Sequence, residues 1–134
     1  MIPLIKNAFL NEIETKKLLA DFIIKAPRLS MSEQCFELEK EFSEYQGASH
    51  SILFNSGSSA NLAMIQALLN LGKLSKGDKV GFSALTWSTN VMPIIQLGLI
   101  PVPIDCEPLT LNVMSSQLLQ RLDDTELKVF FITN

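Results

Sequence analysis

The chain of 134 residues is 47% hydrophobic and carries a formal net charge of −3 at pH 7. This length can form one domain that buries about 68–70% of its unfolded surface, and the acidic pI near 5.1 argues against a nucleic-acid-binding surface. Residues 1–6 lack the apolar core of a signal peptide, and no apolar run is long enough to span a bilayer. Cys35, Cys106 and the single His50 show no metal-ligand spacing, so we expect reduced thiols, a structural histidine and a cytoplasmic protein.

Two helices are predicted near the N-terminus. The first runs from a cap at Asn11 to about Lys25, because Pro27 disfavours helical backbone in the residue before it. The second covers residues 33–45 and ends at Gly47, since glycine readily adopts the left-handed conformation that terminates helices.

The next stretch carries the first functional signal. Residues 52–54 are predicted as a short apolar strand, residues 55–59 as a polar turn, and the segment to about Leu71 as a helix. Small residues at such a turn let a ligand approach the backbone, and the free N–H groups and dipole of the helix start favour an anion, most often phosphate. Ser58 and Ser59 can add hydroxyl donors. Serine is also a favoured helix cap, so the local pattern leaves a purely structural turn open as well.

Strands and helices alternate from there to the end of the chain. We predict strands over residues 79–83, 99–104 and 128–133, and helices over residues 87–96 and from Ser115 or Ser116 to about Leu122. Prolines at positions 101 and 103 remove ladder donors from the second of these strands. That strand should therefore lie near a sheet edge or be irregular.

This alternation predicts an α/β fold with a mostly parallel sheet and right-handed crossovers. We expect a helical segment over residues 1–50, followed by the start of an α/β domain over residues 51–134. The last predicted strand ends close to Asn134, where ligand-contacting loops begin in open α/β sheets. We therefore expect the sequence to be the front of a longer protein.

Several ordered motifs are similar to those of the DegT/DnrJ/EryC1/StrS family of vitamin B6-dependent sugar aminotransferases. The motifs occupy residues 28–32, 45–47, 55–62, 76–79, 86–90, 93–98 and 104–105. The pair Ser-Gly-Ser-Ser-Ala-Asn and Trp-Ser-Thr resembles the branch of nucleotide-sugar 3-dehydratases of the GDP-4-keto-6-deoxymannose 3-dehydratase type, which use pyridoxamine phosphate. The resemblance implies the N-terminal portion of the large domain of the type I aminotransferase fold, a three-layer architecture.

The resemblance also implies a cofactor site for pyridoxal 5'-phosphate or pyridoxamine 5'-phosphate. Gly57, Ser58 and Ser59 would hold the phosphate through backbone N–H and hydroxyl groups. Trp87 would stack on the pyridine ring, although a core role for this indole is the alternative from local features alone. Asn90 would face the cofactor or substrate, although polar helix positions more often face water.

The chemical centre of the family has no counterpart in the sequence. The carboxylate that pairs with the ring nitrogen, and the lysine that binds the cofactor covalently, lie further along the chain in this family. No lysine of this chain falls at a matching position, and His50 is not at the place where the dehydratase branch has histidine instead. We expect no catalytic residue in this chain and no activity from the chain alone.

Three hypotheses follow from the sequence. The chain is the N-terminal part of an aminotransferase or 3-dehydratase that acts on a nucleotide-linked keto-sugar in deoxy- or amino-sugar synthesis for surface polysaccharide. Alternatively, it is a truncated, non-catalytic fragment with weak phosphate binding. An unrelated nucleotide-binding α/β domain is the third reading, but a dinucleotide-binding fold needs three glycines after its first strand and residues 55–60 hold one. The family implies a homodimer without nucleic-acid or membrane partners.

Overall fold

The computed structural model describes residues 7–133, so the predicted lead-in over residues 1–6 and the final residue, Asn134, lie outside it. The chain divides into two compact units, with the boundary between Leu53 and Phe54. The first unit holds α1 (Glu12–Lys25) and α2 (Glu33–Gln46), as predicted. Gly47 follows α2 with a φ of 65°, which is the left-handed cap expected there.

The strand predicted over residues 52–54 is wrong. These residues form no regular element, and the backbone N–H of Leu53 donates to Oε1 of Glu39 at 2.7 Å. A strand needs the backbone of a neighbouring strand as its partner, whereas here a carboxylate of α2 takes the amide. The apolar run is too short for sequence pattern alone to tell a strand from an extended connection.

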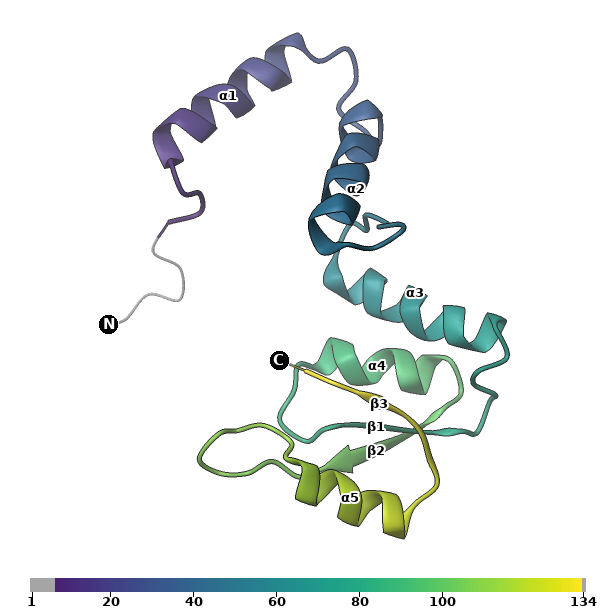
Figure 1. Cartoon of the computed structure of the whole chain (residues 1–134). Coiled ribbons are helices and arrows are strands. Elements are labelled where there is room, and N and C mark those ends of the chain that lie inside the picture. Colours follow the sequence, from purple (N-terminus) through teal and green to yellow (C-terminus); the bar gives the residue numbers. More distant parts are fainter. Residues whose placement is uncertain (1–6, 134) are drawn as a thin grey trace. The chain divides into compact units, whose positions relative to one another are not determined.

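The second unit contains a parallel three-stranded sheet. In chain order it consists of α3 (Gly57–Asn70), β1 (Lys79–Ser83), α4 (Ser88–Gln96), β2 (Ile100–Ile104), α5 (Ser115–Asp124) and β3 (Leu127–Phe131). The strand order is β2-β1-β3, and both pairings are parallel. In Figure 1, α3 and α4 lie to one side of the strands and α5 lies to the other. The predicted α/β fold with a parallel sheet is therefore confirmed.

The core of this unit lies between the sheet and the helix pair α3–α4. Its buried side chains come from the two helices, from the strands β1 and β3 and from the connecting turns: Ile65, Leu74, Val80, Ile94, Leu99 and Phe131. Val80 and Ile94 are fully buried. Burial of each such side chain contributes roughly 1.5–3 kcal/mol, so this cluster holds α3 and α4 against the sheet.

The two prolines of β2 occupy positions that face away from β1. The N–H of Ile100 donates to the carbonyl of Asp78 at 2.9 Å, so the even-numbered residues of β2 turn their amides toward β1. Pro101 and Pro103 then face outward, where a missing N–H costs no bond to β1. The outward carbonyl of Pro103 accepts from Nε of Arg121 at 3.1 Å. Within the described sheet β2 is an edge strand, as the sequence predicts.

Candidate functional site

The predicted phosphate-binding residues lie at the start of α3. Ser56 precedes the helix in extended conformation, and its Oγ accepts from the N–H of Ser59 at 3.2 Å. The same hydroxyl donates to Oγ of Ser59 at 3.1 Å. Ser56 is therefore the cap, a role that the sequence pattern did not single out among the three serines.

The cap leaves the first two amides of the helix available. Among the described residues, no protein group accepts a hydrogen bond from the N–H of Gly57 or Ser58. The first turn carries no acidic side chain, so the positive end of the helix dipole is not neutralised there. A Cβ added at Gly57 meets no atom within 4 Å, which leaves open space beside these donors. The start of α3 therefore offers two free hydrogen-bond donors, a positive electrostatic potential and open space, which are the features that bind a phosphate group.

Trp87 lies at the N-terminal end of the neighbouring helix. It precedes α4 with φ −73° and ψ 141°, and its carbonyl accepts from the N–H of Asn90 at 3.0 Å. The indole is 74% exposed, so the alternative of a core tryptophan does not hold in this structure. An exposed flat ring at a helix start can stack on an aromatic ligand.

Asn90 belongs to a hydrogen-bond network of four side chains. Its Oδ1 accepts from Nδ2 of Asn61 at 2.7 Å, and its Nδ2 donates to Oγ1 of Thr86 at 2.8 Å and of Thr133 at 3.2 Å. The two threonine hydroxyls are 2.9 Å apart and hydrogen-bond each other. Contact between Asn90 and a cofactor stays a prediction, and in this structure its amide serves protein partners.

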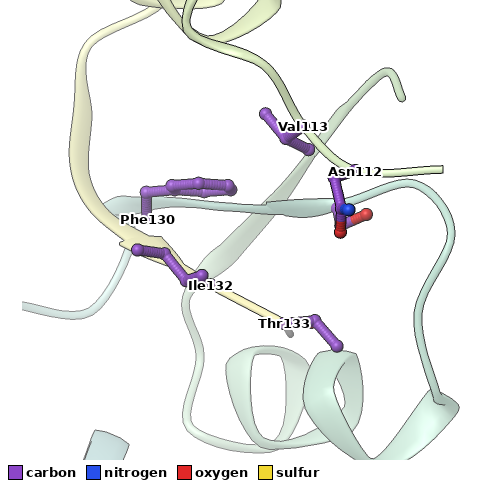
Figure 2. A pocket seen from close by; sticks show the side chains of 6 residues that line it. Asn112, Val113, Phe130, Ile132 and Thr133 are labelled. Atoms are coloured by element: carbon purple, nitrogen blue, oxygen red, sulfur yellow. The ribbon is translucent and has the colours of Figure 1, made fainter. Parts of the chain in front are cut away.

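Two open hollows flank this network. One of about 300 Å³ lies between α3 and α4 and is lined by Ser58, Ser59, Leu62, Thr89, Met92, Pro93 and Gln96. Another of about 290 Å³ lies at the carboxyl ends of β1 and β3 and is lined by Ser83, Asn112, Val113, Phe130, Ile132 and Thr133. Figure 2 shows the loop residues Asn112 and Val113 facing Phe130 and Ile132 across this second hollow. Ligands of open parallel sheets bind at this edge.

Three residues of the network were not assigned a role by sequence reasoning: Asn61, Thr86 and Thr133. The sequence holds one indication of this network, which is the proline at position 93. Pro93 lies inside α4 and has no N–H to donate to the carbonyl of Thr89. That carbonyl needs another donor, and Nδ2 of Asn61 lies 3.4 Å away from it. The pairing joins residues that are 28 positions apart, which local patterns do not reveal.

The lysines of the second unit lie away from this edge. Lys79 begins β1, Lys128 is the second residue of β3, and Lys73 and Lys76 belong to the turn between α3 and β1. All four are therefore at the amino ends of parallel strands, and neither hollow is lined by a lysine. Each strand is five residues long, so roughly 13–17 Å of sheet separates the two edges.

The first unit has a hollow that contains His50. It is lined by Glu39, Lys40, Ser43, Glu44, Ala48, Ser49, His50 and Ser51. Across the described residues no three His, Cys, Asp or Glu side chains gather in a way that could hold a metal ion. None of the helices formed by residues 7–133 has the length and apolar character needed to cross a membrane.

Comparison with known proteins finds a family model and several relatives that match this chain. The model of the DegT/DnrJ/EryC1/StrS aminotransferase family matches residues 11–129. The GDP-4-keto-6-deoxy-D-mannose 3-dehydratase of Yersinia pseudotuberculosis is 40% identical over 93 residues, which are 68% of this chain and 24% of that protein. The spore coat polysaccharide biosynthesis protein SpsC of Bacillus subtilis is 33% identical over 112 residues, which are 84% of this chain and 26% of that protein.

The fold is shared with solved structures. A structure of the Escherichia coli GDP-4-keto-6-deoxy-D-mannose-3-dehydratase with bound hydrated PLP matches with a TM-score of 0.75 and 30% identity, over 90% of this chain and 31% of that chain. This chain thus spans about a quarter of the length of the curated relatives and about a third of the solved enzyme. The predicted portion of the type I aminotransferase fold and the predicted resemblance are both confirmed. Since the family model covers residues 11–129, the chain belongs to the DegT/DnrJ/EryC1/StrS aminotransferase family.

Proposed function

We propose that residues 51–134 are the start of a cofactor-binding domain and hold the phosphate of pyridoxal 5'-phosphate or pyridoxamine 5'-phosphate. The observation that carries the proposal is the pair of available amides at Gly57 and Ser58. Ser58 lines a hollow between α3 and α4, and the exposed Trp87 directly precedes α4. In this assignment the two amides and the Ser58 hydroxyl donate to phosphate oxygens. Ser59 adds its hydroxyl hydrogen, because its oxygen already accepts from Ser56.

The parent protein, in this proposal, is a nucleotide-sugar aminotransferase or 3-dehydratase that makes deoxy- or amino-sugars for surface polysaccharide. The cofactor, when bound, supplies an electron-accepting ring that carries the amino group or stabilises negative charge on the substrate. The residues of this chain supply binding and orientation: the start of α3 fixes the phosphate, and Trp87 covers one face of the ring. Family membership and the PLP-bound dehydratase structure support this assignment.

Binding can be measured through the single tryptophan of the chain. Pyridoxamine 5'-phosphate added to the 134-residue protein should quench Trp87 emission in a saturable way, and inorganic phosphate should reverse the quenching by competition. Gly57→Pro removes one amide donor while keeping the helix, because proline is tolerated at the first helical position and Ser56 is already extended. Loss of one hydrogen bond to a charged group should weaken binding about tenfold or more.

The matched control makes the same change at another helix. Ser115 is the first residue of α5, and the residue before it is extended, so Ser115→Pro removes an equivalent amide far from the proposed site. This variant should bind like the unmodified protein. Equal affinity of the Gly57→Pro and Ser115→Pro variants would refute the phosphate assignment. If inorganic phosphate binds as tightly as the cofactor, the alternative of a fragment with weak phosphate binding alone is favoured.

We further propose that the parent is a cytoplasmic homodimer whose substrate is a nucleotide-linked keto-sugar, without nucleic-acid or membrane partners. The acidic pI supports the absence of a nucleic-acid partner. Dimer formation is supported by the exposed apolar side chains of α1, where Ile13, Leu18 and Ile24 are each more than 60% exposed. Sedimentation velocity of the full-length parent should give twice the monomer mass.

A further inference from the structure

A hydrogen bond between two asparagines joins the helix that carries the phosphate donors to the helix that follows Trp87. Asn61 lies three residues after Ser58 on α3, so both side chains project from the same face of the helix, about 4.5 Å apart along its axis. Asn90 lies three residues after Trp87 and donates its backbone N–H to the Trp87 carbonyl. The bond from Asn61 Nδ2 to Asn90 Oδ1 is 2.7 Å long. It therefore joins the two helices about one turn after Ser58 on α3 and about one turn after Trp87 on α4.

The rest of the network fixes how this bond is oriented. Asn90 Nδ2 donates to two threonine hydroxyls, so its Oδ1 is the atom that must face Asn61. Thr86 precedes Trp87 directly, and Thr133 follows β3. Asn90 therefore ties the segment that carries Trp87 both to α3 and to the carboxyl end of the sheet.

Pro93 leaves a second acceptor on α4 for the side-chain amide of Asn61. Because proline has no N–H, the carbonyl of Thr89 lacks its usual donor within α4. Asn61 Nδ2 lies 3.4 Å from that carbonyl and 2.7 Å from Asn90 Oδ1, so its two hydrogens match two acceptors of α4. All four network side chains are partly buried, which weakens competition from water.

We propose that Asn61 and Asn90 are positioning residues that set the spacing between the phosphate donors of α3 and the ring of Trp87. This inference rests on the proposed function. The two asparagines do not touch the ligand. They act through the backbone of α4, so that a ligand whose phosphate is bound at Gly57 and Ser58 has its ring directly beside the indole.

The experiment compares two ligands on the full 134-residue chain. Calorimetry gives the dissociation constants of inorganic phosphate and pyridoxamine 5'-phosphate, and their ratio measures the advantage that the ring adds. Trp87→Ala should reduce this ratio by between about twofold and about tenfold, as expected for loss of one stacked ring. Asn61→Ala should reduce the ratio equally while leaving phosphate affinity unchanged, and should have no further effect in the Trp87→Ala background.

Controls separate positioning from general loss of structure. Gln66→Ala removes a different exposed side-chain bond of α3, from Gln66 to Asn70, and should leave the ratio unchanged. Should Asn61→Ala fail to fold, Thr86→Val and Thr86→Ser replace it: valine keeps the shape but loses the hydroxyl acceptor for Asn90, so the ratio falls, and serine restores it.

Each outcome decides a different claim. If the unmodified chain binds both ligands and keeps its ratio in the Asn61→Ala and Thr86→Val variants, the positioning role is overturned while the proposed function stands. A parallel loss of phosphate affinity in those variants also overturns it, because the asparagines would then merely hold the unit together. If the unmodified chain shows no ring advantage, the proposed function fails and the positioning role fails with it.

Discussion

Gly81 occupies the middle of β1, where the sheet meets side chains from both neighbouring strands. A Cβ at this position would lie 2.8 Å from Cδ1 of Ile104 and 3.1 Å from Cδ1 of Leu127. Ile104 is only 1% exposed, so its methyl group has little room to move. The glycine is required by close approach of these side chains and not by an unusual backbone angle.

We therefore expect Gly81→Ala to lower the free energy of unfolding by about 1–3 kcal/mol, the usual range for an overpacked core. Urea denaturation followed by far-UV circular dichroism measures the change. Gly57→Ala is the matched control, because a Cβ there meets nothing within 4 Å. A Gly81→Ala variant as stable as this control would show that Ile104 moves aside without cost.

In the connection between β2 and α5, one carboxylate accepts hydrogen bonds from two backbone amides. Oε2 of Glu107 accepts from the backbone N–H of Leu109 at 3.0 Å and of Thr110 at 2.7 Å. These bonds, first that of Leu109 and then that of Thr110, lower the pKa of Glu107 below its ordinary value of 4.5. The same connection leads to Asn112, which lines the hollow at the carboxyl edge (Figure 2).

The lowered pKa predicts a loop that loosens in acid. A depressed carboxyl pKa contributes stability above the ordinary value, and this contribution is lost as the pH falls through the lowered pKa. The amides of Leu109 and Thr110 should therefore shift in NMR spectra as the pH falls below the ordinary value of 4.5, at the titration of Glu107. Glu107→Gln should abolish the titration of these two amides. A titration that persists in the variant would assign the shift to another group.

Over the whole second unit, the predicted ligand site and the lysines are at opposite edges of the sheet. Lys73, Lys76, Lys79 and Lys128 lie at the amino ends of the strands, while the amides of Gly57 and Ser58 lie close to α4, which follows the carboxyl end of β1. A lysine amine on a side chain of about 6 Å does not cross the length of a strand. The absence of a counterpart to the covalent lysine of the family stays a prediction, which these four lysines can test.

Borohydride labelling tests this arrangement. After incubation with pyridoxal 5'-phosphate and reduction, mass spectrometry should find no stoichiometric label on any of these four lysines. Excess pyridoxamine 5'-phosphate, which has no aldehyde, should leave the residual label unchanged, because that label does not depend on the phosphate site. Stoichiometric label on one of them, suppressed by the competitor, would place a reactive amine at the site.

Local chemistry was sufficient to predict most elements. Gly47 ends α2, the prolines of β2 place it at an edge of the described sheet, and alternation of apolar segments predicts the parallel sheet. The turn of small residues before α3 and its available amides also follow from residues that are adjacent in sequence. These features depend on backbone angles, missing donors and periodicity, which neighbouring residues determine.

Only the tertiary structure decided which side chains meet. Residues 52–54 fit the pattern of a strand, yet Leu53 gives its amide to Glu39, 14 positions earlier. Asn61 and Asn90 are 29 positions apart, and their bond exists because the core around Ile65 and Ile94 packs α3 against α4. Sequence determined that a helix start with available amides and a tryptophan before the next helix were present. Packing of α3 and α4 on the sheet decided which side chains of the two helices meet, because partners distant in sequence are selected by burial and geometry and not by local propensity.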